Sequence, residues 1–225
     1  MRKLILLLML CPILSTVKAQ KFPVDGMPSH QQSLNFNVGT QGLGLEYRYG
    51  LNAKFNLRGG FNLLPVSADN VFQVSGFNSS SSVSAKFSSL HAFADFTPFS
   101  GAQFFRLVAG AGYFVKAQGH ALMQPTDNYK YGDIALTQQQ VGNLNMDINW
   151  QGVAPYFGFG LAHAFPRNKF SINADLGTYY LTRPSGTITG TGILAGNFTQ
   201  SGQFQKNISN YRWYPQLAIG FNYKF

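Results

Sequence analysis

The sequence has little charge, a single cysteine and no long apolar run. Asp, Glu, Lys and Arg make up 11% of the 225 residues, well below the roughly one quarter that is usual in soluble domains. Such a charge-poor surface suits contact with lipid better than contact with water. The one cysteine, Cys11, lies close to the N-terminus. Disulfide bonds and thiol chemistry are therefore excluded from the rest of the chain.

The first 19 residues have the features of a secretory signal peptide. Arg2 and Lys3 precede an apolar run from Leu4 to Val17, and the small residue Ala19 supplies a cleavage site. This run is too short to span a bilayer as a helix, which needs about 20 residues. We therefore predict export with removal of residues 1–19, a short periplasmic segment at 20–31, and one domain over 32–225.

The positive charges form no cluster. The chain carries a net charge of +9, but three of its basic residues belong to the predicted signal peptide and the others are scattered. A nucleic-acid-binding protein concentrates Lys and Arg on one face or in one run. The sequence therefore predicts no nucleic-acid partner.

Eight segments alternate apolar residues with small or polar ones. In the closing segment, Leu217, Ile219 and Phe221 alternate with Ala218 and Gly220. Successive side chains of a strand point to opposite faces, so each segment is predicted to be a strand with one apolar face. The other seven segments lie near 34–38, 43–49, 55–62, 90–96, 105–113, 153–161 and 170–177.

The connections between these strands differ in length. Short turns are expected at 50–53, 99–103 and 166–169, and long polar loops at 65–82, 118–149 and 183–210. An even number of strands with short turns at one end and long loops at the other is typical of outer-membrane barrels. We therefore predict an all-β fold, an eight-stranded antiparallel up-and-down transmembrane β-barrel. The three long loops are expected to contact an unknown surface ligand.

The alternation changes register once. Met146, Ile148 and Trp150 occupy even positions, whereas the apolar residues from Val153 onward occupy odd ones. One extra residue in a strand pair restores the alternation after such a change. A β-bulge is therefore predicted near residues 151–152.

Charged residues of both signs fall on the predicted inward faces. Eight strands enclose a space that side chains can fill, and buried charges need partners. We expect an interior network of salt bridges and hydrogen bonds formed by Glu46, Arg48, Arg58, Asp95, Arg106, Asp175 and Arg212. The outward aromatic residues near strand ends are expected at the membrane interfaces, namely Tyr47, Tyr49, Tyr180, Tyr211 and Trp213.

Candidate catalytic residues are few. The four histidines are scattered without metal-ligand spacing, so neither a metal nor a cofactor is expected. Ser89 and His91 share the inward face of one strand with Asp95, and these are the residue types of a lipid esterase. Residues two apart on a strand are separated by about 6.6 Å, which is long for a direct Ser–His hydrogen bond. A polar pair in the barrel interior is therefore favoured, and an outer-membrane lipid-modifying hydrolase is an alternative.

Four stretches resemble the small outer-membrane β-barrel superfamily that includes the OmpA transmembrane domain and the opacity-type porins. They are GLGLEYRYGLNAKFNLRGGFN, VAPYFGFGLAHAF, FSINADLGTYY and the closing YPQLAIGFNYKF. The resemblance covers about residues 32 to 225. It implies a bacterial outer-membrane location, contact with outer-membrane lipids and lipopolysaccharide, and a C-terminal signal for the barrel-assembly machinery in Phe221, Tyr223 and Phe225.

The resemblance specifies a fold more than a function, because barrels of this kind serve several purposes. The main hypothesis is a non-enzymatic barrel protein with a structural or surface-interaction role. A secreted soluble β-barrel that carries a small apolar ligand is a further alternative. That carrier would need an apolar interior, which the inward charges argue against.

Overall fold

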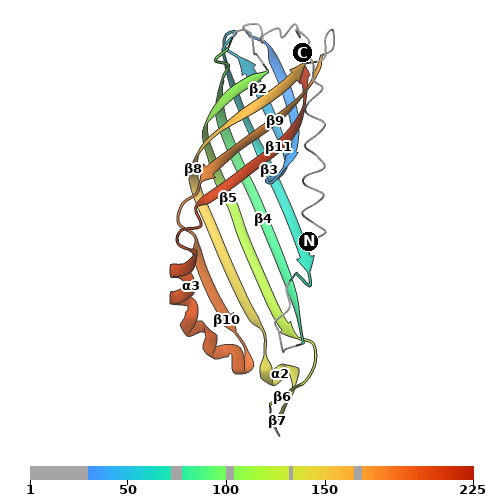
Figure 1. Ribbon diagram of the computed structural model, residues 1–225, viewed down its shortest axis with the longest axis vertical. Helices are drawn as coiled ribbons and strands as arrows, with labels where there is room; N and C mark the ends of the chain where they lie inside the picture. The colour runs from blue at the N-terminus through green and yellow to red at the C-terminus, as the bar shows by residue number, and fades with distance from the viewer. Residues whose placement is uncertain (1–29, 72–77, 100–103, 132–133, 165–168) are drawn as a thin grey trace, which may run out of the picture.

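The computed structural model of the protein describes residues 30–71, 78–99, 104–131, 134–164 and 169–225. The predicted signal peptide and nearly all of the predicted segment at 20–31 lie outside these ranges. The barrel strands are β1 (Gln32–Gly39), β2 (Gly42–Gly50), β3 (Phe55–Asp69), β4 (Ser79–Phe96), β5 (Phe105–Pro125), β8 (Leu144–Ala164), β9 (Phe170–Tyr180) and β11 (Trp213–Lys224) (Figure 1). The other elements are β6 (Tyr129–Tyr131), β7 (Ile134–Leu136), α2 (Gln138–Val141), β10 (Ser185–Gly190), η2 (Gly192–Gln200) and α3 (Ser201–Ile208).

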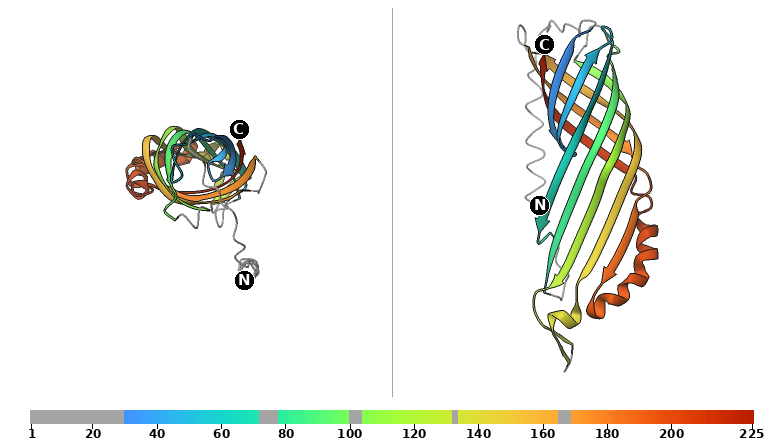
Figure 2. Two further views of the ribbon diagram at one scale, coloured as in Figure 1. Left: turned by 90° about the horizontal axis from the view of Figure 1, so that it is seen from above. Right: turned by 180° about the vertical axis from the view of Figure 1, so that it is seen from behind.

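The barrel strands form a closed antiparallel ring (Figure 2). The order is β8-β5-β4-β3-β2-β1-β11-β9, and β9 pairs with β8 to complete the circle. The first and last strands pair from Ser33 opposite Lys224 to Gly39 opposite Ala218. Closure lets the backbone groups pair within the chain, which is what a lipid environment requires. The predicted eight-stranded antiparallel barrel is confirmed.

Among the residues that the structure describes, no helix combines the length and the apolar character that a membrane crossing requires.

The period-two pattern separates the two faces of the barrel wall. In β1, Asn35 is fully buried and Phe36 is 52% exposed. In β11, Asn222 is buried and Phe221 is 48% exposed. Soluble domains bury such large apolar side chains, whereas a barrel in lipid turns them outward. The polar residues in turn face the interior, where the charged side chains meet.

Four strands continue beyond the ring, away from the end where the chain terminates (Figure 1). We call this part the sheet extension. It comprises residues 64–69 of β3, 79–88 of β4, 117–125 of β5, 144–150 of β8 and all of β10, which pairs with residues 144–149 of β8. The prediction of long polar loops at 65–82, 118–149 and 183–210 is therefore wrong for much of their length. In β4, Val83, Ala85 and Phe87 alternate with two serines and Lys86, a strand pattern that the serine-rich composition concealed.

A β-bulge separates the ring from the sheet extension. Phe114 pairs with Gly152, and Ala117 pairs with Trp150, so two residues of β5 lie opposite one residue of β8. Gly152 has a φ of 111°, a conformation that side chains disfavour. A bulge does lie opposite Gln151, but the extra residue belongs to β5. In β8 the even-numbered residues face inward on both sides of it, as Trp150 and Ala154 show, so the change of alternation that predicted the bulge has another cause.

The polarity of the two faces reverses at this bulge. In the ring, the outward face is apolar and the inward face is polar. In the sheet extension, Trp150 and Phe87 pack against the buried core on the inward side, together with the fully buried Ala117. The alternation therefore places Val83, Ala85, Met146 and Ile148 on the inward face, and Ser84, Lys86, Asn145, Asp147 and Asn149 on the outward face. The outer surface of the extension thus suits water, as that of the ring suits lipid.

Side chains of α3 cover the outer edge of β10. The hydroxyl of Ser201 accepts a hydrogen bond from the backbone N–H of Ile188 (3.2 Å), and the side-chain amide of Gln205 bonds both Gly186 N–H (2.7 Å) and Pro184 C=O (2.8 Å). Exposed strand edges attract further strands. Here the helix occupies hydrogen-bonding groups that a further strand would use.

Candidate functional site

Six charged side chains form one layer across the barrel interior, which we call the charged layer. Arg58 lies at its centre, with Nη1 2.7 Å from Asp175 Oδ2, Nε 3.0 Å from Asp95 Oδ1 and Nη1 3.3 Å from Glu46 Oε2. Arg106 Nη2 lies 2.7 Å from Asp175 Oδ1, and Arg48 Nη2 lies 3.1 Å from Glu46 Oε2. Three cations thus face three carboxylates, and all six side chains are less than 10% exposed.

The neutral form of His91 fits its two contacts at this layer. Its Nε2 lies 3.2 Å from Glu46 Oε1, and its Nδ1 lies 3.3 Å from the Asn62 amide nitrogen. A ring protonated on Nε2 alone donates to the carboxylate and accepts from the amide. The charges of the six side chains balance without a contribution from His91.

The space for the charged layer comes from small residues on the facing strands. A Cβ atom at Gly160 would overlap both Arg106 and Asp175. Gly160 lies opposite Arg106 on β5 and opposite Asp175 on β9. The absence of a side chain at this position therefore lets the ion pair pass over the inner face of β8.

An amide ladder continues the network from the charged layer. The Asn35 amide donates to Glu46 Oε2 (3.1 Å), the Asn173 amide donates to Asn35 Oδ1 (2.7 Å), and Arg48 donates to Asn173 Oδ1 (3.3 Å). All of these side chains are buried. Each hydrogen bond satisfies a group that would be costly to leave unpaired in the dry interior.

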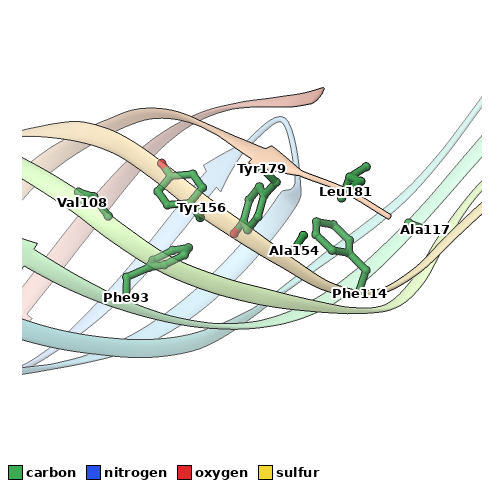
Figure 3. Packing of buried hydrophobic residues seen from close by; sticks show 8 residues of the cluster. All are labelled: Phe93, Val108, Phe114, Ala117, Ala154, Tyr156, Tyr179 and Leu181. Atoms are coloured by element: carbon green, nitrogen blue, oxygen red, sulfur yellow. The ribbon is translucent and has the colours of Figure 1, made fainter. Parts of the chain in front are cut away.

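Aromatic side chains fill the lumen between the charged layer and the sheet extension (Figure 3). We call them the aromatic layer, defined as Phe93, Phe114, Tyr156 and Tyr179. The ring centroids of Phe93 and Tyr156 are 4.5 Å apart, those of Tyr156 and Tyr179 are 4.7 Å apart, and those of Tyr179 and Phe114 are 5.3 Å apart. All four are at most 3% exposed. The Arg58 guanidinium lies 5.0 Å from the Phe93 ring centroid, which joins the two layers.

Sequence reasoning did not identify the aromatic layer. Phe93 and Tyr156 lie in the predicted strands 90–96 and 153–161, but the alternation of those strands gives neither residue a role. The signal was present, since Phe93, Phe114, Tyr156 and Tyr179 all fall on inward positions of their strands. Their shared position along the barrel axis depends on the stagger between neighbouring strands. The alternation within a single strand gives no information about that stagger.

Arg212, predicted to join the interior network, does not do so. Its guanidinium stacks on the Tyr180 ring, 4.1 Å from the centroid, and its Nε donates to the backbone C=O of Leu181 (2.9 Å). The residue precedes the first residue of β11, Trp213. The strand alternation that assigned Arg212 to the inward face therefore does not extend to it.

The predicted interface aromatics lie in different surroundings. Tyr47 and Trp213 are exposed on outward faces, and the Trp213 ring packs at a tilt against Tyr180, with 4.8 Å between the centroids. Tyr49 is half-buried and contacts His30 edge-on. Tyr211 lies before β11, where its backbone C=O accepts a hydrogen bond from the Trp150 indole (3.0 Å). Their contact with membrane interfaces stays a prediction, as does the role of Phe221, Tyr223 and Phe225 in assembly.

The alternative catalytic residues are each bonded to other partners. Ser89 Oγ donates to Gln41 Oε1 (3.3 Å), His91 contacts Glu46 and Asn62, and Asp95 pairs with arginines of the charged layer. All three catalytic candidates are buried inside the barrel. The described residues include no cluster of three or more His, Cys, Asp or Glu side chains that could hold a metal ion.

The fold, but not the sequence, relates the chain to known proteins. No family model and no curated protein matches it. The crystal structure of Acinetobacter baumannii CarO2 is similar, with a TM-score of 0.65 and 20% identity over 87% of this chain and 98% of that one. The structure of CarO from the same organism gives a TM-score of 0.63 and 19% identity over 86% of this chain and 97% of that one.

These comparisons define the class of fold. Its fold is that of the small outer-membrane β-barrels, as the resemblance in the sequence implied. Within that class, the structures to which it is similar include CarO2 and CarO. The predicted location in the bacterial outer membrane agrees with this fold.

Proposed function

We propose that the protein is a non-enzymatic outer-membrane barrel with a closed lumen, which acts at the cell surface through its sheet extension. The charged layer is the observation that carries this proposal. Its six buried side chains bridge β2, β3, β4, β5 and β9 across the interior. An eight-stranded barrel has room inside for little more than its own side chains.

The aromatic layer supports the same conclusion. A solute that crossed the barrel would have to displace four packed aromatic rings and then separate ion pairs at 2.7 Å. Breaking one buried ion pair costs about 3–5 kcal/mol. This arrangement favours a structural interior over a permanently open pore.

The outward face supports residence in lipid over a soluble carrier role. Leu34, Phe36, Leu57, Leu107 and Ile219 belong to an apolar surface that surrounds the ring. A soluble monomer rarely exposes so continuous an apolar surface. We propose contact with outer-membrane lipids and lipopolysaccharide there, and insertion by the barrel-assembly machinery.

The partners of the catalytic candidates favour a non-enzymatic role. A Ser–His pair needs a hydrogen bond that lets the histidine remove the serine proton. In this interior, His91 is engaged by Glu46 and Asn62, and Ser89 is engaged by Gln41. Lipid would also have to enter the packed lumen to reach them.

Two measurements test this proposal. Outer membranes are isolated from expressing cells and run on detergent gels with and without boiling; we expect a folded band that changes mobility only after boiling. The purified protein is then added to planar lipid bilayers, where we expect no stable conductance. A soluble periplasmic location would refute the membrane assignment, and steady channel openings would refute the closed lumen.

A third measurement addresses the hydrolase alternative. Lipids and lipopolysaccharide from cells that express the wild type, Ser89→Ala or the matched control Ser84→Ala are compared by mass spectrometry. Ser84 lies on the outward face of the same strand. We expect identical profiles for all three proteins. A product that disappears only with Ser89→Ala would establish the hydrolase.

A further inference from the structure

A cavity lies where the sheet extension meets the mouth of the ring, and we call it the mouth cavity. Its volume is about 430 Å³, within the range of small-molecule sites. Phe87, Ile148 and Trp150 line it from the extension. The other lining residues lie at the end of β9, in α3 and around the start of β11.

The mouth cavity has a closed floor. Tyr214 and Phe87 stack there, with 5.3 Å between the ring centroids, and both pack against the core cluster that contains the aromatic layer. The Tyr214 hydroxyl donates to the backbone C=O of Thr40 (2.7 Å), which ties the floor to the β1–β2 turn. A molecule in the cavity is therefore held above the lumen and not passed into it.

Two polar groups of the lining are already engaged. The Trp150 indole N–H donates to the backbone C=O of Tyr211, and the Tyr214 hydroxyl is used in the floor. Ile148, Leu181 and Ile208 offer only hydrocarbon, and no charged side chain lines the cavity. An ionised ligand would lose its hydration here without gaining a partner.

The wall formed by α3 is fixed before any ligand arrives. Ile208, at the end of this helix, is only 6% exposed. The hydrogen bonds of Ser201 and Gln205 to β10 hold the helix against the sheet extension. A preformed site loses less conformational entropy on binding than one that must be assembled.

From this lining, we propose that the mouth cavity binds an uncharged aromatic small molecule. Five of its eight lining residues are aromatic, namely Phe87, Trp150, Tyr211, Trp213 and Tyr214. A flat ring gains stacking or edge contacts with such walls beyond the burial of its surface. A saturated acyl chain would gain only from the burial of its apolar surface. This inference extends the proposed surface role by assigning a ligand class to the sheet extension.

The chain carries its own reporter for this site. It has two tryptophans, and both line the cavity. The probe is the uncharged aromatic fluorophore N-phenyl-1-naphthylamine, which receives excitation energy from nearby tryptophan. Full-length protein in lipid nanodiscs is titrated with it. The titration uses Trp213→Phe as the parent, so that Trp150 is the donor.

The variants are chosen in one strand. Ile148→Glu places a carboxylate in the cavity, and Asn149→Glu adds the same charge on the outward face of β8. Ile148→Phe fills the cavity without adding charge. Boiling-dependent gel mobility confirms that each variant is folded.

We expect saturable energy transfer at one probe per protein. We also expect affinity to fall about tenfold or more with Ile148→Glu, to fall with Ile148→Phe, and to stay unchanged with Asn149→Glu. Naphthalene should displace the probe. A non-saturable signal that all variants share would mean partition into lipid and would overturn the proposal. Displacement by a fatty acid but not by naphthalene would overturn it in favour of an acyl chain.

Discussion

Removing the charge of Asp175 tests whether the charged layer holds the barrel together. Asp175 lies 2.7 Å from both Arg58 and Arg106 and 3.8 Å from Arg48. Asp175→Asn keeps the size of the side chain but leaves three arginines facing two carboxylates. Removing one partner of a buried ion pair destabilises a protein by about 3–5 kcal/mol.

The matched control is Asp147→Asn in the sheet extension. Asp147 lies 2.8 Å from His120, but its side chain is 43% exposed. An exposed pair contributes about 0–1 kcal/mol. The same chemical change is therefore expected to have two very different costs in one protein.

The assay is urea unfolding in detergent micelles. At each urea concentration, a gel measures the fraction of the protein that keeps the mobility of the folded band. With a denaturant dependence of about 2 kcal/mol per molar urea, Asp175→Asn should lower the midpoint by about 2 M. Asp147→Asn should leave it nearly unchanged. Equal midpoints for the two variants would refute the reasoning.

The double variant Arg106→Gln/Asp175→Asn refines this test. It restores an equal number of cations and carboxylates in the charged layer. Neighbouring residues in one network show non-additive effects, so the double variant should lose less stability than the two single variants together. If the losses of stability of the two single variants simply added in the double variant, charge balance would not determine the loss of stability.

Three further predictions concern other parts of the molecule. Gly160→Ala should cost about 1–3 kcal/mol in the same urea assay, because its methyl group would displace the ion pair that passes over Gly160; an unchanged midpoint would contradict this. Gln205→Ala should speed proteolysis within residues 191–210, since α3 loses its hydrogen bonds to Gly186 of β10 and to the preceding Pro184, whereas the exposed Gln203→Ala should not. Phe225→Ala should reduce the amount of folded protein in outer membranes, measured on unboiled gels, if the terminal aromatics direct assembly; an unchanged amount would remove that role.

The period-two alternation was sufficient to predict most of the ring. In the strands around Asn35 and Phe36, or Phe221 and Asn222, the face of each residue follows from its position alone. Burial of charges of both signs then required that they pair. This is why the six members of the charged layer could be named without their distances.

Features that depend on neighbouring strands could not be predicted in this way. The aromatic layer requires the relative heights of Phe93 and Tyr156, which the stagger of the ring sets. Arg212 lies outside its strand, where alternation no longer applies. The sheet extension was missed because its inward residues are apolar, the reverse of the ring, and because the segment around Val83 and Ala85 is rich in serine.

The reversal of polarity at the bulge makes one strand subject to two solvents. In β4, Leu90 is 55% exposed on the face proposed to meet lipid, so Leu90→Ser would place a hydroxyl among acyl chains. Six residues earlier, Ser84 faces the other medium, and Ser84→Leu would instead create an adhesive patch in water. The substitutions that β4 tolerates thus change between Ser88 and Ser89, the neighbours at which its register with β5 shifts.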